Sequence, residues 1–434
     1  MTAATQAIPT QISGPLPWRS SFSALTVRNF RIFWGANVLA MTATWMQRIA
    51  QDWLVLQLTG SAALVGVTVF VQFAPMLFLG LFGGVIVDRY PKRQLLMGTQ
   101  GAVGVVSLVL AVLSLTGTVV VWQVWVAALV IGMTTVVDNP ARQVFANELV
   151  GPAHLRNAIT LNSSAFQLGM LLGPAVSGLL IVAVGGGWSF AINAVACVVT
   201  VVALTRLRVA ELYPHTPTPR SSGQLREGLH YAAVKPTILW PVIMVSFLSV
   251  FTLTMPVLLT AYASDVFHIG AAGYGLLNSL FAVGALAGAV LSTRRRTLRL
   301  RTVIICGGVW ALLQVTASFM PSEAMFGAAL IACGIANQFF FMAGNPLIQL
   351  SSNTAIRGRV MALYVLVLLG GQALGGPLMG GIVDLAGAQA AMLVSGLVPA
   401  VAATAIGLLL AHRGALHLAL SWRHATPHLS IQPR

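Results

Sequence analysis

Long, unbroken apolar segments fill most of this 434-residue sequence. Hydrophobic residues make up 57% of the chain and charged residues only 8%, whereas a soluble domain carries roughly 25% charged residues. An apolar segment of about 20 residues is long enough to cross a lipid bilayer as a helix. Because these segments are continuous rather than alternating, helices are favoured over a closed barrel. The sequence therefore predicts an all-α integral membrane protein.

We expect twelve transmembrane helices, arranged as two pseudo-symmetric halves of six helices each. Short polar gaps, rich in glycine or arginine, mark the ends of the apolar segments. The predicted segments cover residues 30–58, 62–88, 94–116, 119–140, 157–182, 187–206, 237–263, 272–293, 302–320, 323–345, 359–384 and 388–412.

All but one of the 24 lysine and arginine residues lie in every second gap between these segments, or in the two tails. Basic loops stay on the cytoplasmic side of a membrane, so we expect both termini in the cytoplasm and an even number of helices. A net charge of +15 would suggest nucleic acid as the partner of a soluble protein, but here the positive charges line one membrane face. We therefore predict a multi-pass protein of the inner (cytoplasmic) membrane that contacts the lipid bilayer and no nucleic acid.

A polar stretch separates the two halves. It contains Pro214, Pro217 and Pro219, which interrupt helices, followed by a short amphipathic piece. The predicted divisions are a cytoplasmic N-terminal tail at 1–28, a first half at 29–206, a cytoplasmic linker at 207–236, a second half at 237–412 and a cytoplasmic C-terminal tail at 413–434.

The two halves carry the same short motifs in the same order. Six-helix repeats related by an axis along the membrane normal are typical of transporters whose substrate passes between the halves. The separations are 206, 203 and 204 residues, close to half of the chain. The matching pairs are Asn139-Pro140 with Asn345-Pro346, Gly173-Pro174 with Gly376-Pro377, and Gly84 with Gly288.

The loop after the second segment combines a glycine, an acid and several bases. Asp88 ends its helix, where the helix dipole is already negative, so it needs a cation or another helix N-terminus opposite it. Arg142 and the start of the eleventh segment are the candidate partners. A pairing that forms in only one arrangement of the halves would act as a cytoplasmic latch, and a fixed anchor for the loop is the alternative. The predicted latch residues are Gly84, Asp88, Arg89, Lys92, Arg93 and Arg142.

The fifth segment has little bulk on one face and a proline in its interior. Proline removes one backbone hydrogen bond, so Gly173-Pro174 is expected to bend the helix. Small residues also let neighbouring helices approach closely, and close packing alone would explain the motif. The motif residues are Gly169, Gly173, Pro174, Ser177 and Gly178.

These motifs resemble those of the major facilitator superfamily. The loop at 84–93 is similar to the superfamily's loop 2–3 signature, with Pro91 in place of its second glycine. The fifth-segment motif resembles that of drug–proton antiporters, with Ser177 in place of a glycine. Residues 29–180 look like the bacterial exporter branch that includes macrolide efflux proteins and the enterobactin exporter. The resemblance implies the major facilitator fold and export, and it associates the fifth-segment motif with limited leak.

Arg48 is the one basic residue inside an apolar segment, and Asp52 follows one helical turn later. At 1.5 Å per residue from Phe30, Arg48 would lie about 27 Å along the helix, in the outer half of the membrane. A charge at the bilayer centre costs roughly 2.5–3.5 kcal/mol, so we expect the two residues to pair inside the bundle. Protonation of Asp52 would free Arg48 and couple protons to movement of the halves, whereas a permanent ion pair or an outer gate is the alternative. Asp138, at the inner end of the fourth segment, is the second coupling candidate, or else a helix-end anchor beside Arg142.

Neutral polar residues inside the apolar segments are candidates for a substrate cavity. Such residues also hold helices together by hydrogen bonds, which is the alternative for each of them. The apolar majority suits a hydrophobic or amphipathic substrate. The candidate cavity residues are Gln47, Gln72, Gln167, Asn278, Gln338 and Gln372.

The sequence predicts a secondary active transporter rather than an enzyme. It carries no phosphate-binding loop, nucleophile elbow or metal cluster, so we expect no cofactor, no metal and no use of ATP. We predict a monomer that exports a drug or metabolite by proton antiport, through rocking of the two halves. Export of a siderophore or another self-made metabolite is one alternative. A membrane receptor that transports nothing is the other.

Overall fold

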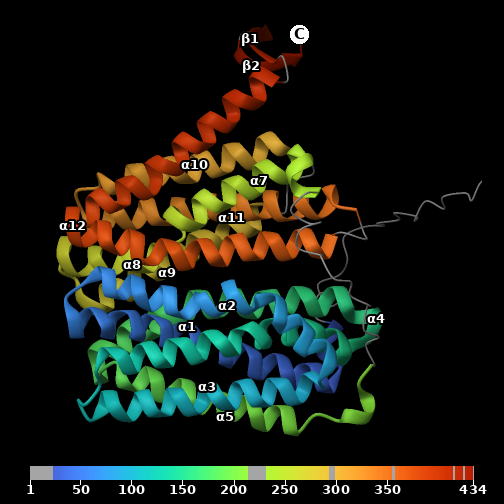
Figure 1. The fold of residues 1–434 in the computed structure, drawn as a ribbon, viewed down its shortest axis with the longest axis vertical. Coiled ribbons are helices and arrows are strands. Elements are labelled where there is room, and N and C mark those ends of the chain that lie inside the picture. The colour runs from blue at the N-terminus through green and yellow to red at the C-terminus, as the bar shows by residue number, and fades with distance from the viewer. Residues whose placement is uncertain are drawn as a thin grey trace, which may run out of the picture.

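The computed structural model describes residues 23–213, 231–292, 299–353, 357–413, 416–423 and 426–433. Most of the predicted N-terminal tail and residues 214–230 of the predicted linker lie outside the described residues. Figure 1 shows α1 to α5 stacked side by side in one half of the molecule and α7 to α12 in the other. This is the two-layer arrangement expected from the repeated motifs.

The first half contains five helical elements and a short 3₁₀ turn. One of them, α4, carries two predicted segments and changes direction at Gly151, whose φ of 65° is not helical. The elements are α1 (Arg28–Thr59), α2 (Ala62–Arg89), α3 (Lys92–Leu115), α4 (Val121–Val184), α5 (Gly187–Thr205) and the turn η2 (Val209–Glu211).

The second half begins with a helix that is interrupted twice by π-turns. Its last helix, α12, is broken at Gly387, where φ is 86° and ψ is 163°. The elements are α7 (Pro236–Phe247), η3 (Leu248–Thr252), α8 (Met255–Ala261), η4 (Tyr262–Val266), α9 (Gly270–Ser292), α10 (Leu300–Ser318), α11 (Glu323–Ser351) and α12 (Arg357–Arg413).

Ten stretches in the described part of the chain are long and apolar enough to cross a membrane. The last of them, Arg359–His412, has 54 residues and includes the break at Gly387. At 1.5 Å per residue it is about 80 Å long, more than twice the thickness of the hydrocarbon core. Helix α1, which carries Arg48 and Asp52, is not among the ten. The all-helical membrane architecture is therefore confirmed, and the count of twelve crossings stays a prediction.

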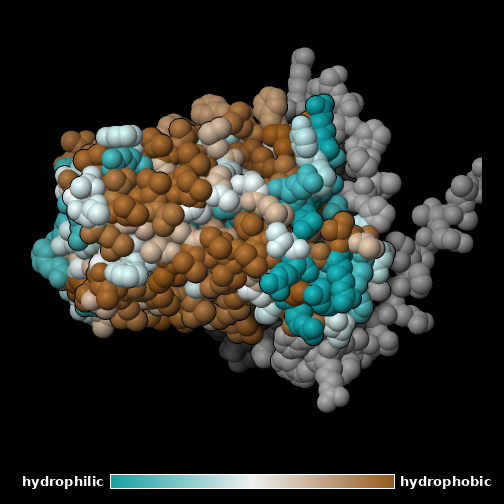
Figure 2. All heavy atoms as spheres, turned by 90° about the horizontal axis from the view of Figure 1, so that it is seen from below, coloured by the Kyte–Doolittle hydropathy of each residue, from teal (hydrophilic) through white to brown (hydrophobic). Residues whose placement is uncertain are grey.

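The surface of the bundle is apolar over its middle and polar at its ends. Figure 2 shows a broad hydrophobic band with hydrophilic residues gathered toward the two ends of the helices. Large apolar side chains face outward in this band, and Phe78, Leu179 and Val290 are 68%, 69% and 64% exposed. Lipid is the solvent that such a surface requires. Inside the bundle, the largest cluster of buried apolar side chains draws on both halves.

Two of the predicted helix ends are wrong. The fourth segment was expected to end at residue 140 and the tenth at 345, each beside an Asn-Pro pair. In the structure α4 remains helical through Pro140 up to the break at Gly151, and α11 runs through Pro346 to Ser351. A proline has a φ that suits a helix and removes only one hydrogen bond, so a packed helix continues past it.

The chain ends in a short β-hairpin. Strands β1 (Leu416–Arg423) and β2 (Thr426–Pro433) pair antiparallel, with Leu416 opposite Pro433. Figure 1 places the hairpin beyond the end of α12 and away from the bundle. These residues fall in the stretch expected to be a C-terminal tail.

The two ends of the bundle differ in charge. We call the end that carries Arg89, Lys92, Arg93, Arg208 and Lys235 the basic end. The other end, which we call the opposite end, contains the turn between α1 and α2 and the break in α12 at Gly387. By the predicted topology the basic end faces the cytoplasm.

Candidate functional site

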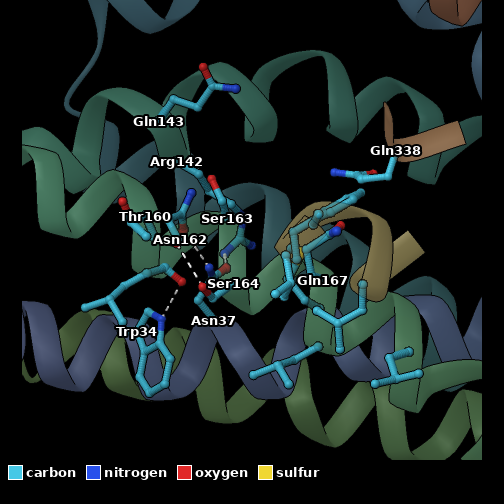
Figure 3. A pocket seen from close by; sticks show the side chains of 18 of the residues that line it. Trp34, Asn37, Arg142, Gln143, Thr160, Asn162, Ser163, Ser164, Gln167 and Gln338 are labelled. Atoms are coloured by element: carbon cyan, nitrogen blue, oxygen red, sulfur yellow. Dashed lines mark hydrogen bonds between the residues drawn. The ribbon is translucent and has the colours of Figure 1, made fainter. Parts of the chain in front are cut away.

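A pocket of about 1010 Å³ lies between the two halves, toward the basic end. Its walls come from α1 and α4 of the first half and from α9 and α11 of the second. Figure 3 shows the polar side chains of this pocket, most of them on α4. None of the residues that line it is acidic. The polar and aromatic lining residues are Trp34, Asn37, Asn139, Arg142, Gln143, Thr160, Asn162, Ser163, Ser164, Phe166, Gln167 and Gln338.

A hydrogen-bonded chain fixes one wall of the pocket. The Arg142 Nη1 donates to Asn37 Oδ1 at 2.8 Å, and Asn37 Nδ2 donates to Asn162 Oδ1 at 2.8 Å. The Trp34 indole donates to the Leu161 carbonyl at 2.8 Å (Figure 3). These bonds join α1 to both parts of α4, so the polar wall is rigid before any substrate arrives.

Arg142 is balanced by a buried carboxylate. It forms a salt bridge with Asp138 one turn earlier on α4. The Asp138 Oδ1 also accepts hydrogen bonds from Thr99 Oγ1 at 2.7 Å and from Gln100 Nε2 at 3.0 Å. The expected pairing of Arg142 with Asp88 is therefore not formed, because α4 continues past Pro140 and turns Arg142 toward Asp138. For the same reason Asp138 lies inside the helix and not at its end.

Two of the six predicted cavity residues line the pocket, Gln167 from α4 and Gln338 from α11. The other four lie elsewhere. Gln47 is buried and accepts hydrogen bonds from Ser107 and Asn193, and Asn278 donates to its own helix. Gln72 is buried, and neither Gln72 nor Gln372 lines the pocket. A single sequence gives the residue types inside a helix but not the face each one occupies in a bundle.

The pocket also contains polar residues that were not predicted as lining. Gln143 and Asn139 belong to the Asn-Pro-Ala-Arg-Gln motif, which was singled out only for its repetition in the second half. Asn37 and Asn162 gave no signal in the sequence, since isolated asparagines occur throughout the helices.

The predicted ion pair between Arg48 and Asp52 is not formed. Among the described residues no salt bridge involves either side chain. The Arg48 guanidinium instead lies over the Trp45 ring, 4.9 Å from its centroid, and 5.5 Å from that of Phe73. The Asp52 carboxylate, in a residue only 6% exposed, accepts a hydrogen bond from the Tyr274 hydroxyl at 3.2 Å.

The Asp52–Tyr274 contact joins the two halves. Asp52 lies near the end of α1, whereas Tyr274 lies near the start of α9, both toward the opposite end. The Trp53 ring stacks on Tyr274 with centroids 6.1 Å apart and an interplanar angle of 23°. Asp52 therefore bonds to Tyr274, which is 222 residues away in sequence, and not to Arg48 on its own helix.

Three of the six predicted latch residues, Lys92, Arg93 and Arg142, contact their own half. Lys92 forms a salt bridge with Glu148 at 3.5 Å, and Arg93 donates to the Leu204 carbonyl at 2.7 Å. Arg89 is exposed and Asp88 is half-buried. A latch at this loop stays a prediction. Next to Gly84, a Cβ on Gly83 would overlap the Val136 carbonyl of α4, so this part of α2 packs closely against α4.

The fifth-segment motif packs against two different helices. A Cβ on Gly169 would lie 2.8 Å from the Met41 backbone, and one on Gly173 would lie 2.9 Å from the amide nitrogen of Met46, both on α1. Gly178 faces the second half, and a Cβ there would lie 3.0 Å from Gly275 of α9. Pro174 also lies against α9, because a Cβ on Gly275 would lie 2.6 Å from the Pro174 carbonyl oxygen. Ser177 is fully buried, and its Oγ lies 3.4 Å from that of Ser189.

The opposite end of the bundle is closed by contacts between the halves. A Cβ on Gly376 of α12 would lie 2.6 Å from the Gly66 carbonyl of α2, so the two backbones touch. The Asp384 carboxylate caps the start of α2, because it accepts from the amides of Ala62 at 2.9 Å and Ala63 at 3.2 Å. The Ser61 hydroxyl donates to the same carboxylate at 2.5 Å. These contacts hold the two halves together at the opposite end, away from the pocket.

Comparisons with known proteins agree with this geometry. A family model described as transmembrane secretion effector matches residues 19–431. The enterobactin exporter EntS of Escherichia coli is 24% identical over 371 residues, which are 84% of this chain and 88% of that protein. The staphyloferrin A transporter of Staphylococcus aureus is 26% identical over 152 residues, which are 35% of this chain and 38% of that protein.

A solved structure shares the architecture. It is a bacterial homologue of the human lysosomal transporter Spinster, in an inward-facing and unoccupied conformation. The TM-score is 0.69 at 14% identity, over 91% of this chain and 97% of that one. At this identity the likeness shows a shared fold and carries nothing about a shared substrate.

Proposed function

Because the chain belongs to the transmembrane secretion effector family of the major facilitator superfamily, we propose that it exports an amphipathic small molecule across the cytoplasmic membrane. The family is one of membrane transporters, so the expectation of a transporter rather than an enzyme is confirmed. In this proposal the protein works as a monomer, with both termini in the cytoplasm. The halves alternate between an arrangement open to the cytoplasm and one open to the outside.

The observation that carries the proposal is the pocket between the halves at the basic end, together with the closed contacts at the opposite end. In this proposal the basic end faces the cytoplasm, as the distribution of positive charges predicts. A substrate would therefore enter from the cytoplasm and leave after the opposite end opens. The apolar side chains and carboxamides of the pocket suit a molecule with both apolar and hydrogen-bonding parts.

A siderophore or a related self-made metabolite is the substrate class we favour. Two relatives carry the names of a siderophore exporter and a siderophore transporter, and one of them aligns over 84% of this chain. A lipophilic drug is the second candidate, favoured by the aromatic and apolar part of the pocket wall, which includes Trp34 and Phe166.

Asp52 is the group to which we assign proton coupling. Its carboxylate accepts a bond from Tyr274 of the other half, and Arg48 lies one turn earlier on the same helix. A hydrogen bond to a charged carboxylate is stronger than one to a neutral acid. Protonation of Asp52 would therefore weaken a contact that holds the halves together, and so link proton uptake to opening of the opposite end.

Flux in everted membrane vesicles and in proteoliposomes tests the function. Labelled enterobactin, staphyloferrin A and a panel of lipophilic drugs are offered with and without an imposed proton gradient. We expect uptake of at least one of these compounds into everted vesicles and its loss with an uncoupler. Binding without flux in every case would instead identify a receptor that transports nothing.

Asp52→Asn tests the coupling. This variant should still move substrate down its gradient but no longer respond to the proton gradient, because the side chain cannot be charged. Tyr274→Phe should weaken the response, since it removes the donor. Glu323→Gln, at an exposed position of the opposite end, is the matched control. A normal gradient response in Asp52→Asn would exclude Asp52 as the proton carrier.

A further inference from the structure

The guanidinium of Arg48 has no acceptor within the described protein. No hydrogen bond or salt bridge between described residues involves it, and its Nε is buried without a partner. Arginine remains charged in proteins and has five donors. A buried donor without an acceptor is costly, and more so when it is charged. An arrangement of this kind is expected where a ligand supplies the acceptor.

The faces of the guanidinium are occupied, but its outer edge is not. The Trp45 ring of α1 and the Phe73 ring of α2 lie 4.9 and 5.5 Å from its central carbon. Contacts with ring faces stabilise the positive charge without using the N–H groups. Unlike Nε, the two terminal nitrogens are not among the buried atoms, and the residue is partly exposed. The edge that binds carboxylates in a two-pronged manner is therefore free.

Asp52, the acid on the same helix, does not bind the terminal nitrogens of Arg48. Asp52 lies one turn away, and its carboxylate is directed to the Tyr274 hydroxyl of the other half. Attraction between the two charges persists, but the donors of Arg48 remain without an acceptor. The contrast is Arg142, which donates from Nε and Nη2 to Asp138 and from Nη1 to Asn37. Arg142 is buried and paired with a carboxylate, whereas Arg48 is partly exposed and has no carboxylate partner among the described residues.

Arg48 adjoins the pocket through a pair of aromatic rings. Phe166 lines the pocket and contacts the Trp45 ring edge-on, with centroids 5.7 Å apart. The guanidinium of Arg48 lies over the same Trp45 ring. Arg48 therefore lies behind Phe166 and Trp45 as seen from the pocket, and further along α1 toward the opposite end than the lining residue Met41.

We propose that Arg48 is the binding site for a carboxylate group of the exported molecule, so that the substrate class is an amphipathic anion. This inference rests on the proposed export function, which supplies the path from the pocket to Arg48. The pocket lining has no acidic residue that would repel such a molecule. The aromatic rings on either side of Arg48 would contact the apolar part next to the carboxylate.

Two fluorescent probes that differ by one charge test this proposal. Dansyl-leucine carries a carboxylate, and dansyl-leucinamide carries a neutral amide on the same body. Binding of each is measured on the full-length protein in lipid nanodiscs. A hydrogen bond to a charged group should make the carboxylate probe bind roughly tenfold or more tightly than the amide. Arg48→Gln should remove this preference while leaving binding of the amide probe unchanged.

Arg31→Gln is the matched control, because Arg31 lies on the same helix and is exposed at the basic end. It should retain the preference. Binding of the amide probe to Arg48→Gln shows that the pocket is intact, so a misfolded variant is recognised. Equal binding of the two probes to the unaltered protein, or equal losses for both in Arg48→Gln, would overturn the proposal.

Flux separates this proposal from the proposed function. Transport of neutral compounds without any preference for the carboxylate probe would leave export standing and remove the role of Arg48. A clear carboxylate preference that depends on Arg48, in a protein that moves no compound, would support the anion site and contradict export.

Discussion

The buried pair of Arg142 and Asp138 shows how a charge is accommodated inside this bundle. The two side chains are 5% and 12% exposed, and Thr99, Gln100 and Asn37 form further hydrogen bonds with them. Removing one partner of such a pair typically costs about 3–5 kcal/mol, because the other charge is left uncompensated. The pair therefore matters for stability even though it also forms part of the pocket wall.

Arg142→Gln should lower the thermal unfolding temperature of the purified protein markedly, and so should Asp138→Asn. The double variant should be more stable than either single variant, since it leaves no unpaired charge. The exposed pair of Arg208 and Glu211 is the control, and its loss should cost about 0–1 kcal/mol. Additive losses in the double variant would contradict this account.

Local spacing predicted the charged residues of interest but not their partners. The four-residue interval between Arg48 and Asp52 places both on one face of α1, and this much holds. The sequence could not show that Tyr274 competes for Asp52, because that contact depends on how α9 packs against α1. Rotation of a helix about its axis is decided by tertiary packing.

Helix α12 meets α2 through glycines at the opposite end of the bundle. A Cβ on Gly380 would lie 2.5 Å from the Ala62 carbonyl and 2.7 Å from the Ala63 Cα. A Cβ on its neighbour Gly381 would meet nothing within 4 Å. Two adjacent glycines of one helix thus differ only in whether they face the other half.

Gly380→Ala should open the opposite end, and Gly381→Ala should not. The two substitutions raise helix propensity equally. A difference between the two variants therefore reports the overlap of the new Cβ at position 380 with α2. An overlap that costs about 1 kcal/mol would raise the open population roughly fivefold. The measurement is the rate at which a thiol reagent added from the outside labels Val65→Cys, in a protein whose three native cysteines have been replaced. Equal labelling rates for the two alanine variants would argue against glycine contact as the seal.

The apolar segments predicted most of the helices because length and hydropathy alone decide what can cross a bilayer. The wrong predictions concern helix ends and the final hairpin, which length and hydropathy do not determine. Pro140 and Pro346 were taken as helix ends, but both are interior residues of helices. The residues that follow them pack in buried apolar clusters, Phe145 in one and Leu347 in the other. The hairpin after α12 was also missed, although β1 has large apolar residues at every second position, the pattern typical of a strand: Leu416, Leu418, Leu420 and Trp422.

The molecule as a whole uses its internal repeat to close one end. In the first half the Gly-Pro motif brings Gly178 against Gly275 of the second half. In the second half the matching motif brings Gly376 against Gly66 of the first. The two motifs, 203 residues apart in sequence, therefore both contact the other half, but through different positions of the motif. Alternating access requires both contacts to separate together, along with the cap that Asp384 forms on α2.

A reversible cross-link at the opposite end tests this requirement directly. Ser61 and Asp384 lie within hydrogen-bond distance of each other and belong to different halves, so Ser61→Cys with Asp384→Cys should form a disulfide on oxidation. The native cysteines Cys197, Cys306 and Cys333 are buried and would be replaced first. The oxidised protein should lose export while still binding substrate from the basic end, because the pocket remains open there.

Reduction of the disulfide should restore export. The oxidised and reduced forms of the same double variant both lack the Asp384 cap, so a difference between them reports only the cross-link. Ser61→Cys alone controls for the oxidant. Undiminished export by the cross-linked protein would mean that substrate does not leave between α2 and α12. The path would then have to run elsewhere, and the glycine contacts would be packing with no part in transport.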